Sequence, residues 1–127
     1  MLQVVCALIE RDGKVLLAQR SASMRHPGLW EFPGGKLEGS ESPEQCLLRE
    51  IKEELGIAIA IIQPLPALNF QYPGEQPFVL IPFIAYILSG EISLTEHSAV
   101  VWVLPDQLLD WPLVAADVGV AKCLMSR

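Results

Sequence analysis

The sequence predicts an α/β domain, because strand-like and helix-like segments alternate along its 127 residues. Short apolar runs typical of β-strands cover residues 3–9, 14–20, 58–62, 78–88 and 100–104. Helix-start signals at Ser42 and near Asp117 introduce two helical segments. The hydrophobic fraction of 51% allows a sizeable core, and the length fits a single domain over residues 1–127.

The first two strands are expected to form a hairpin, because Asp12-Gly13 between them is a turn signal. Arg20 ends the second strand, and a polar loop follows over residues 21–28. In the next stretch Trp30 and Phe32 alternate around Glu31, as on a short strand. Each ring could either pack in the core or offer its face to a nucleobase.

The segment from residue 42 to residue 56 carries the clearest helix signals. Ser42 can cap the helix, Pro43 suits its first position, and Gln45 completes a capping box. Gly56 favours the left-handed geometry that ends a helix. At about 100° per residue, the apolar side chains form a stripe that can be buried. That stripe consists of Leu47, Leu48, Ile51 and Leu55.

Glu50, Glu53 and Glu54 fall on a second stripe of this helix, rotated by roughly 120° from the apolar one. Like charges at these spacings repel, and Arg49 can relieve part of this by reaching Glu53 one turn on. One interpretation is a solvated acidic face. However, Mg²⁺ binds carboxylates together with waters and phosphate oxygens, and the helix signals fix these carboxylates in place. We therefore predict a metal site.

Later segments give weaker signals. Pro82 interrupts the apolar run 78–88, so this strand is expected to place it at an edge or a bulge, after a loop over residues 69–77. Residues 105–109 predict a short helix, and a terminal helix ends near Met125, with Asp117 able to cap it. Glu96 and His97 precede the last strand, where such side chains are usually solvated.

Composition excludes several classes of protein. The net charge of −6 argues against a surface that binds polynucleotides. No apolar run approaches the roughly 20 residues of a membrane helix, and the first residues lack the pattern of a signal peptide. The three cysteines are widely spaced and are expected to be reduced thiols of a cytoplasmic protein.

The stretch from Gly35 to Ile57 resembles the Nudix box, G-x5-E-x7-R-E-U-x-E-E-x-G-U. All defined positions match, namely Gly35, Glu41, Arg49, Glu50, Ile51, Glu53, Glu54, Gly56 and Ile57. The preceding L-W-E-F-P-G-G run is similar to that of MutT-like pyrophosphohydrolases. The resemblance implies a Nudix fold, a mixed β-sheet sandwiched between helices. It also implies hydrolysis of a nucleoside triphosphate to the monophosphate and pyrophosphate.

The same resemblance implies roles for individual residues. Glu50, Glu53 and Glu54 would bind Mg²⁺, with Mn²⁺ as a possible substitute, assisted by the carbonyl of Gly34 and by Glu96. Either Glu50 or Glu96 would activate the water. Arg49 would position the glutamates. On the substrate side, Arg20 would hold the nucleotide, while Phe32 and Phe78, with Leu80 and Phe83, would line the base pocket or pack in the core.

The C-terminal P-L-x-x-A-D pattern resembles the bacterial CTP pyrophosphohydrolase branch and places Asp117 at the base. A carboxylate accepts a hydrogen bond well from cytosine N4. The alternative substrate is an oxidised purine nucleotide such as 8-oxo-dGTP, for which MutT uses an asparagine where this chain has Ala116. A non-catalytic binding module is less favoured, because all the box glutamates are present. The partner would be a small nucleotide, and the protein a monomer or a homodimer.

Overall fold

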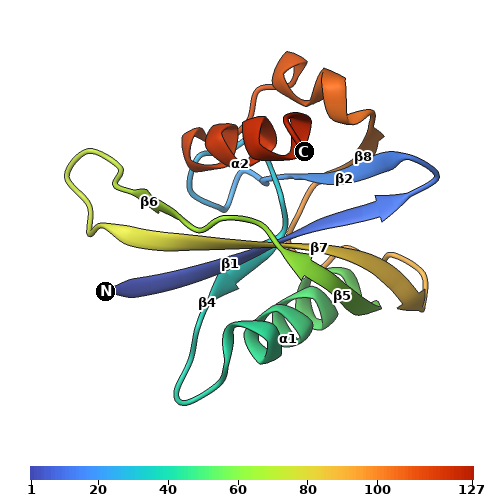
Figure 1. The fold of residues 1–127 in the computed structure, drawn as a ribbon, viewed down its shortest axis with the longest axis horizontal. Coiled ribbons are helices and arrows are strands. Elements are labelled where there is room, and N and C mark those ends of the chain that lie inside the picture. Colours follow the sequence, from blue (N-terminus) through green and yellow to red (C-terminus); the bar gives the residue numbers. More distant parts are fainter.

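The computed structural model describes all residues 1–127 and has an α/β/α arrangement, as predicted (Figure 1). A twisted, mixed sheet of eight strands lies in the middle. Helix α1 (Pro43–Leu55) covers one face of the sheet. Helix α2 (Ala115–Met125) and the short 3-10 helix η1 (Pro105–Asp110) cover the other. None of these helices is long and apolar enough to span a membrane.

Two long central strands, β1 (Leu2–Arg11) and β7 (Phe78–Ser89), run parallel to each other. The predicted hairpin joins β1 to β2 (Lys14–Gln19), with positive φ at Asp12 and Gly13. Strand β2 also pairs with β3 (Trp30–Glu31) and β8 (Ala99–Val103). Strand β4 (Gly34–Lys36) pairs with β1, and both β5 (Ala58–Pro64) and β6 (Leu68–Phe70) pair with β7. Strands β4 and β6 were not predicted.

Pro82 was expected at an edge or a bulge of the sheet. The edge position is wrong, because β7 has neighbours on both sides, but Pro82 does lie at an irregularity, in the gap between the pairing of β7 with β5 and with β6. Pro82 stands opposite Cys6 of β1, and its carbonyl accepts a hydrogen bond from the backbone N–H of Leu65. A strand residue directs its nitrogen and its carbonyl to the same side, so the missing N–H also faces Leu65. That residue lies between β5 and β6, where the ladder along β7 is interrupted, so a proline is tolerated there.

Helix α1 has the predicted ends. Ser42 and Gln45 form the capping box, and Gly56 closes the helix with φ of 70°. The buried face differs by one residue from the prediction, because Leu48 is 44% exposed whereas Cys46 is fully buried. Leu48 is about 100° from Leu47 around the axis, at the edge of the stripe. The buried face therefore extends from Leu47 towards Cys46, which is the side of the helix where the glutamates lie.

Two apolar cores lie on the two faces of the sheet, and β1 contributes to both. Val5, Ala7 and Ile9 pack on the α1 side. Cys6 and Leu8 pack on the α2 side, together with Phe32. Burial on both faces explains why β1 reads as a continuous apolar run. The three cysteines are free thiols, as predicted.

Candidate active site

A single cleft of about 760 Å³ gathers the predicted site residues. They come from different elements: the end of β2, the segment β3–β4, helix α1, strand β7, the loop before β8, and helix α2. Those that line the cleft are Arg20, Phe32, Gly34, Glu50, Glu53, Glu54, Phe78, Glu96 and Asp117. Arg49 does not line the cleft; it contacts the carboxylates of Glu50 and Glu53.

Arg49 organises the carboxylates of α1 from this position. Its Nη1 lies 3.0 Å from Glu50 Oε1 and 3.2 Å from Glu53 Oε2, which confirms the predicted contact with Glu53. Its Nη2 lies 2.7 Å from Glu41 Oε1, which also accepts from the backbone N–H of Glu38. These hydrogen bonds, chiefly those from Arg49, lower the pKa of Glu41 to about 2. Arg49 therefore ties the loop before α1 to the helix.

Gly35 allows the carboxylate of Glu50 to lie directly against strand β4. A Cβ added at Gly35 would lie 2.4 Å from Glu50 Cδ, far inside van der Waals contact. Any side chain at this position would push the carboxylate away. The close approach explains the glycine, whose backbone needs no unusual conformation here.

Unlike the exposed Glu53, Glu54 is mostly buried. Its side chain is 18% exposed, and Oε2 is buried with no hydrogen-bond partner. Burial, followed by the nearby Glu50, raises the pKa of Glu54. The position follows from the helix, because Glu54 lies only about 20° from Leu47 around the axis. An unpartnered buried carboxylate oxygen in this setting fits a cation.

The charge of the cleft supports the same fit. Seven carboxyl groups line it, against three guanidinium or ammonium groups, those of Arg20, Arg25 and Lys36. A polyphosphate would be repelled from such a surface unless cations were bound to it. The residues present therefore suit divalent metal ions, as the sequence predicted.

His97 and Glu31 belong to the site although the sequence did not predict them. The expectation that His97 is solvated is wrong, because its side chain is 1% exposed. Its Nε2 lies 2.7 Å from Glu31 Oε2, and its Nδ1 lies 3.8 Å from Glu54 Oε1. Glu31 also pairs with Arg20 at 2.8 Å. The alternation of side chains along a strand could have predicted the position of Glu31. Trp30 and Phe32 both pack in the α2-side core, so Glu31 between them faces the opposite side.

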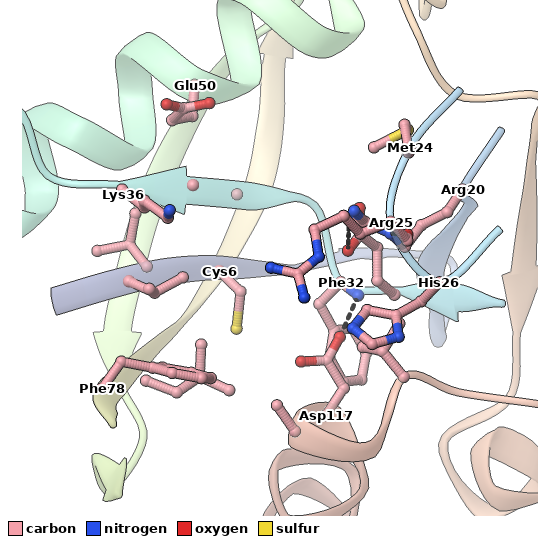
Figure 2. A pocket seen from close by; sticks show the side chains of 18 of the residues that line it. Cys6, Arg20, Met24, Arg25, His26, Phe32, Lys36, Glu50, Phe78 and Asp117 are labelled. Carbon is pink, nitrogen blue, oxygen red and sulfur yellow. Dashed lines mark hydrogen bonds and ion pairs between the residues drawn. The ribbon is translucent and has the colours of Figure 1, made fainter. Parts of the chain in front are cut away.

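Asp117 lies away from the α1 carboxylates, at the N-terminal end of α2 (Figure 2, with Glu50 above and Asp117 below). Its alternative role as a helix cap is wrong, because α2 begins two residues earlier, at Ala115. Instead, the backbone N–H of Phe32 donates to Asp117 Oδ2 at 2.8 Å. Asp117 is only 5% exposed, and burial raises its pKa to about 8.

Aromatic side chains surround this end of the cleft. Phe78 and Leu80 line it, whereas Phe83 packs in the α1-side core. Phe32 is also a lining residue but is 2% exposed, so it forms part of the floor. Trp30 packs edge-on against Trp111 with ring centroids 5.1 Å apart, which settles its role as packing.

Two loops meet at the mouth of the cleft through contacts that the sequence did not reveal. His26 stacks on Tyr72 with ring centroids 4.7 Å apart. Arg25 forms an ion pair with Glu75, which ties the same two loops together. Both pairs join residues some 46–50 positions apart, so no local pattern could predict them.

Comparison with known proteins places these features in a family context. The NUDIX domain matches residues 1–122. The CTP pyrophosphohydrolase of Escherichia coli K12 is 40% identical, over 99% of this chain and 93% of that protein. The 8-oxo-dGTP diphosphatase of Proteus vulgaris is 43% identical over 57% of this chain and 62% of that protein. The crystal structure of a MutT NUDIX hydrolase from Burkholderia pseudomallei superimposes with a TM-score of 0.86, at 31% identity and 96% coverage of both chains.

Proposed function

The chain belongs to the Nudix hydrolase family, and from this membership we propose that it hydrolyses cytidine or deoxycytidine triphosphate, or a modified pyrimidine nucleotide. The products would be the nucleoside monophosphate and pyrophosphate. The observation that carries the choice of base is the buried carboxyl group of Asp117, fixed by Phe32 away from the α1 carboxylates. The relative from E. coli, which is a CTP pyrophosphohydrolase, supports the same choice.

The α1 end of the cleft would hold the metal ions. We assign Mg²⁺, with Mn²⁺ as a substitute, to Glu50, Glu53 and Glu54, assisted by the carbonyl of Gly34 and by Glu96. When bound, the ions would polarise the phosphates, lower the pKa of a bound water and offset charge on the leaving group. Arg49 holds two of these carboxylates in position before substrate arrives.

Glu96 is the better candidate to take the proton of the attacking water. Glu50 already accepts a hydrogen bond from Arg49, so one of its oxygens is engaged. Glu96 is exposed and makes no hydrogen bond or ion pair with another residue. A carboxylate without a partner can turn towards a water bound at the neighbouring glutamates. Of the two alternatives that the sequence left open, we therefore favour Glu96.

Arg20 would hold the nucleotide between the two ends of the cleft. Its Nη1 donates to Glu31, and its Nε donates to the carbonyl of Arg25, so the guanidinium plane is fixed. Arginine has five N–H donors, and the remaining ones are available for a phosphate or for the base.

Asp117 would select the base. With a pKa of about 8, its carboxyl group is mostly neutral at pH 7. A neutral carboxyl group accepts one hydrogen bond and donates another. Cytosine offers a matching pair, an amino donor at N4 beside an acceptor at N3. A neutral carboxyl group can also pair with the carbonyl and N–H of uracil or guanine, so the preference for cytosine rests also on the relative from E. coli. The aromatic lining, including Phe78, would pack against the ring.

A second candidate is hydrolysis of 8-oxo-dGTP, supported by the relative from P. vulgaris. The side chain at position 116 counts against it, because Ala116 carries no amide to read the purine edge. A non-catalytic binding module is disfavoured, because all the box glutamates are present and organised by Arg49.

The test is release of pyrophosphate with Mg²⁺ from CTP, dCTP, 5-methyl-dCTP, dGTP, 8-oxo-dGTP and ADP-ribose. We expect cytosine nucleotides to be preferred, with pyrophosphate rather than two molecules of orthophosphate as the product. Preference for 8-oxo-dGTP would refute the assignment of the base. No turnover with any nucleotide, together with metal-dependent nucleotide binding, would refute the proposed hydrolysis.

A further inference from the structure

His97 and Glu54 each have one buried polar atom without a hydrogen-bond partner. These are Nδ1 of His97 and Oε2 of Glu54. The side chain of His97 is 1% exposed, so water does not supply the missing contact from bulk solvent. Buried polar groups are rarely left unsatisfied, and such a group needs an explanation. Both atoms lie in the cleft where the metal ions are proposed.

Glu31 determines which nitrogen of His97 is free. Oε1 of Glu31 accepts from Arg20, and Oε2 lies 2.7 Å from His97 Nε2. An ionised carboxylate only accepts hydrogen bonds, so Nε2 carries the proton. A metal-binding imidazole would have this tautomer, and Nδ1 lies on the side of Glu54. Because both oxygens of Glu31 are engaged, Glu31 orients the ring and is not itself free to bind an ion.

The distance between His97 Nδ1 and Glu54 Oε1 is 3.8 Å, too long for a hydrogen bond. Metal bonds to nitrogen and to oxygen are each about 2.1 Å long, so one ion can contact both atoms across such a gap. A carboxylate behind the second ring nitrogen is the usual support of a metal-binding histidine.

We propose that His97 Nδ1 is a nitrogen ligand of the ion that Glu54 binds, oriented by Glu31. The inference rests on the proposed metal role of Glu54 and adds a ligand of a different chemical type. Imidazole favours first-row transition metals, whereas Mg²⁺ favours sites made of oxygen. In affinity, the site that contains Glu54 therefore favours Mn²⁺ or Co²⁺ over Mg²⁺, while Mg²⁺ remains the ion assigned to turnover.

The test is pulsed EPR of the tag-free protein loaded with Mn²⁺ alone, which detects nitrogen bound directly to the ion. The chain has two histidines, so the signal can be assigned. We expect a nitrogen coupling that changes when histidine is labelled with ¹⁵N, persists in His26→Gln and disappears in His97→Gln. In His26→Gln the only remaining histidine is His97, so that protein decides the question even if His97→Gln does not fold.

A second readout is metal affinity measured by calorimetry. Loss of the nitrogen ligand in His97→Gln is expected to weaken Mn²⁺ binding about tenfold or more and Mg²⁺ binding less. The absence of histidine coupling in the wild type, or its persistence in His97→Gln, would overturn the proposal. If the wild type then still released pyrophosphate with Mg²⁺, the proposed function would stand without this ligand. If the wild type showed neither histidine coupling nor release of pyrophosphate, the proposed function would be refuted as well.

Discussion

Replacing Asp117 by asparagine should change how the stability of the protein depends on pH. Asp117 has a pKa of about 8 in the folded protein, against 3.8 for an ordinary aspartate, because burial disfavours its charged form. Asparagine has the same shape, and its amide oxygen can still accept from the Phe32 N–H. The variant therefore removes the ionisation while keeping the hydrogen bond.

The sign and size of the effect follow from proton binding. Below the unfolded pKa both states hold the proton, and the stability from this group is fully present. As the pH rises towards 8, the unfolded state loses the proton first, so this stability is lost. Between the two pKa values, the free energy of unfolding of the wild type should fall by about 1.4 kcal/mol per pH unit relative to that of Asp117→Asn.

Urea unfolding at pH 5, 6 and 7 measures this difference, because contributions from other groups cancel between the two proteins. Asp106→Asn is the matched control, since Asp106 is exposed on η1 and its variant should run parallel to the wild type. Parallel curves for Asp117→Asn and the wild type would show that Asp117 is already ionised in the folded protein. That result would refute the neutral carboxyl group proposed at the base end of the cleft.

Three further substitutions test the α1 end of the cleft. Glu53→Gln is expected to abolish turnover, with a loss of at least about a hundredfold and an unchanged melting temperature. The control variant is Glu44→Gln, on the exposed first turn of α1, which should keep full activity. Gly35→Ala should displace the Glu50 carboxylate, which lowers kcat and costs about 1–3 kcal/mol of stability, measured by urea unfolding. Arg49→Lys should cost about 1 kcal/mol and lower kcat, because lysine cannot contact several carboxylates at once; unchanged kcat would contradict its positioning role.

Local signals in the sequence predicted helix α1 and the carboxylates on it. The capping box at Ser42, the left-handed Gly56 and the spacing of the glutamates are all short-range features. The hairpin at Asp12-Gly13 is of the same kind. For such features the sequence neighbours already determine the geometry, so the structure confirms the prediction.

Features that depend on distant residues could not be predicted in this way. Glu31 and His97 are 66 positions apart, and only the fold brings their side chains together. Strand β4 is formed by Gly34, Gly35 and Lys36, which show no strand pattern and are extended because they pair with β1. The place of Pro82 in a central strand depends on where β5 ends and β6 begins, which tertiary pairing decides.

Competition between CTP and 8-oxo-dGTP in one reaction with Mg²⁺ tests the central claim most directly. The ratio of the two rates of monophosphate formation gives the ratio of their kcat/KM values. We predict that the wild type favours CTP and that Asp117→Ala loses most of this preference, because the base then lacks its partner. Faster formation of 8-oxo-dGMP, or a preference for CTP that is unchanged in Asp117→Ala, would contradict the account.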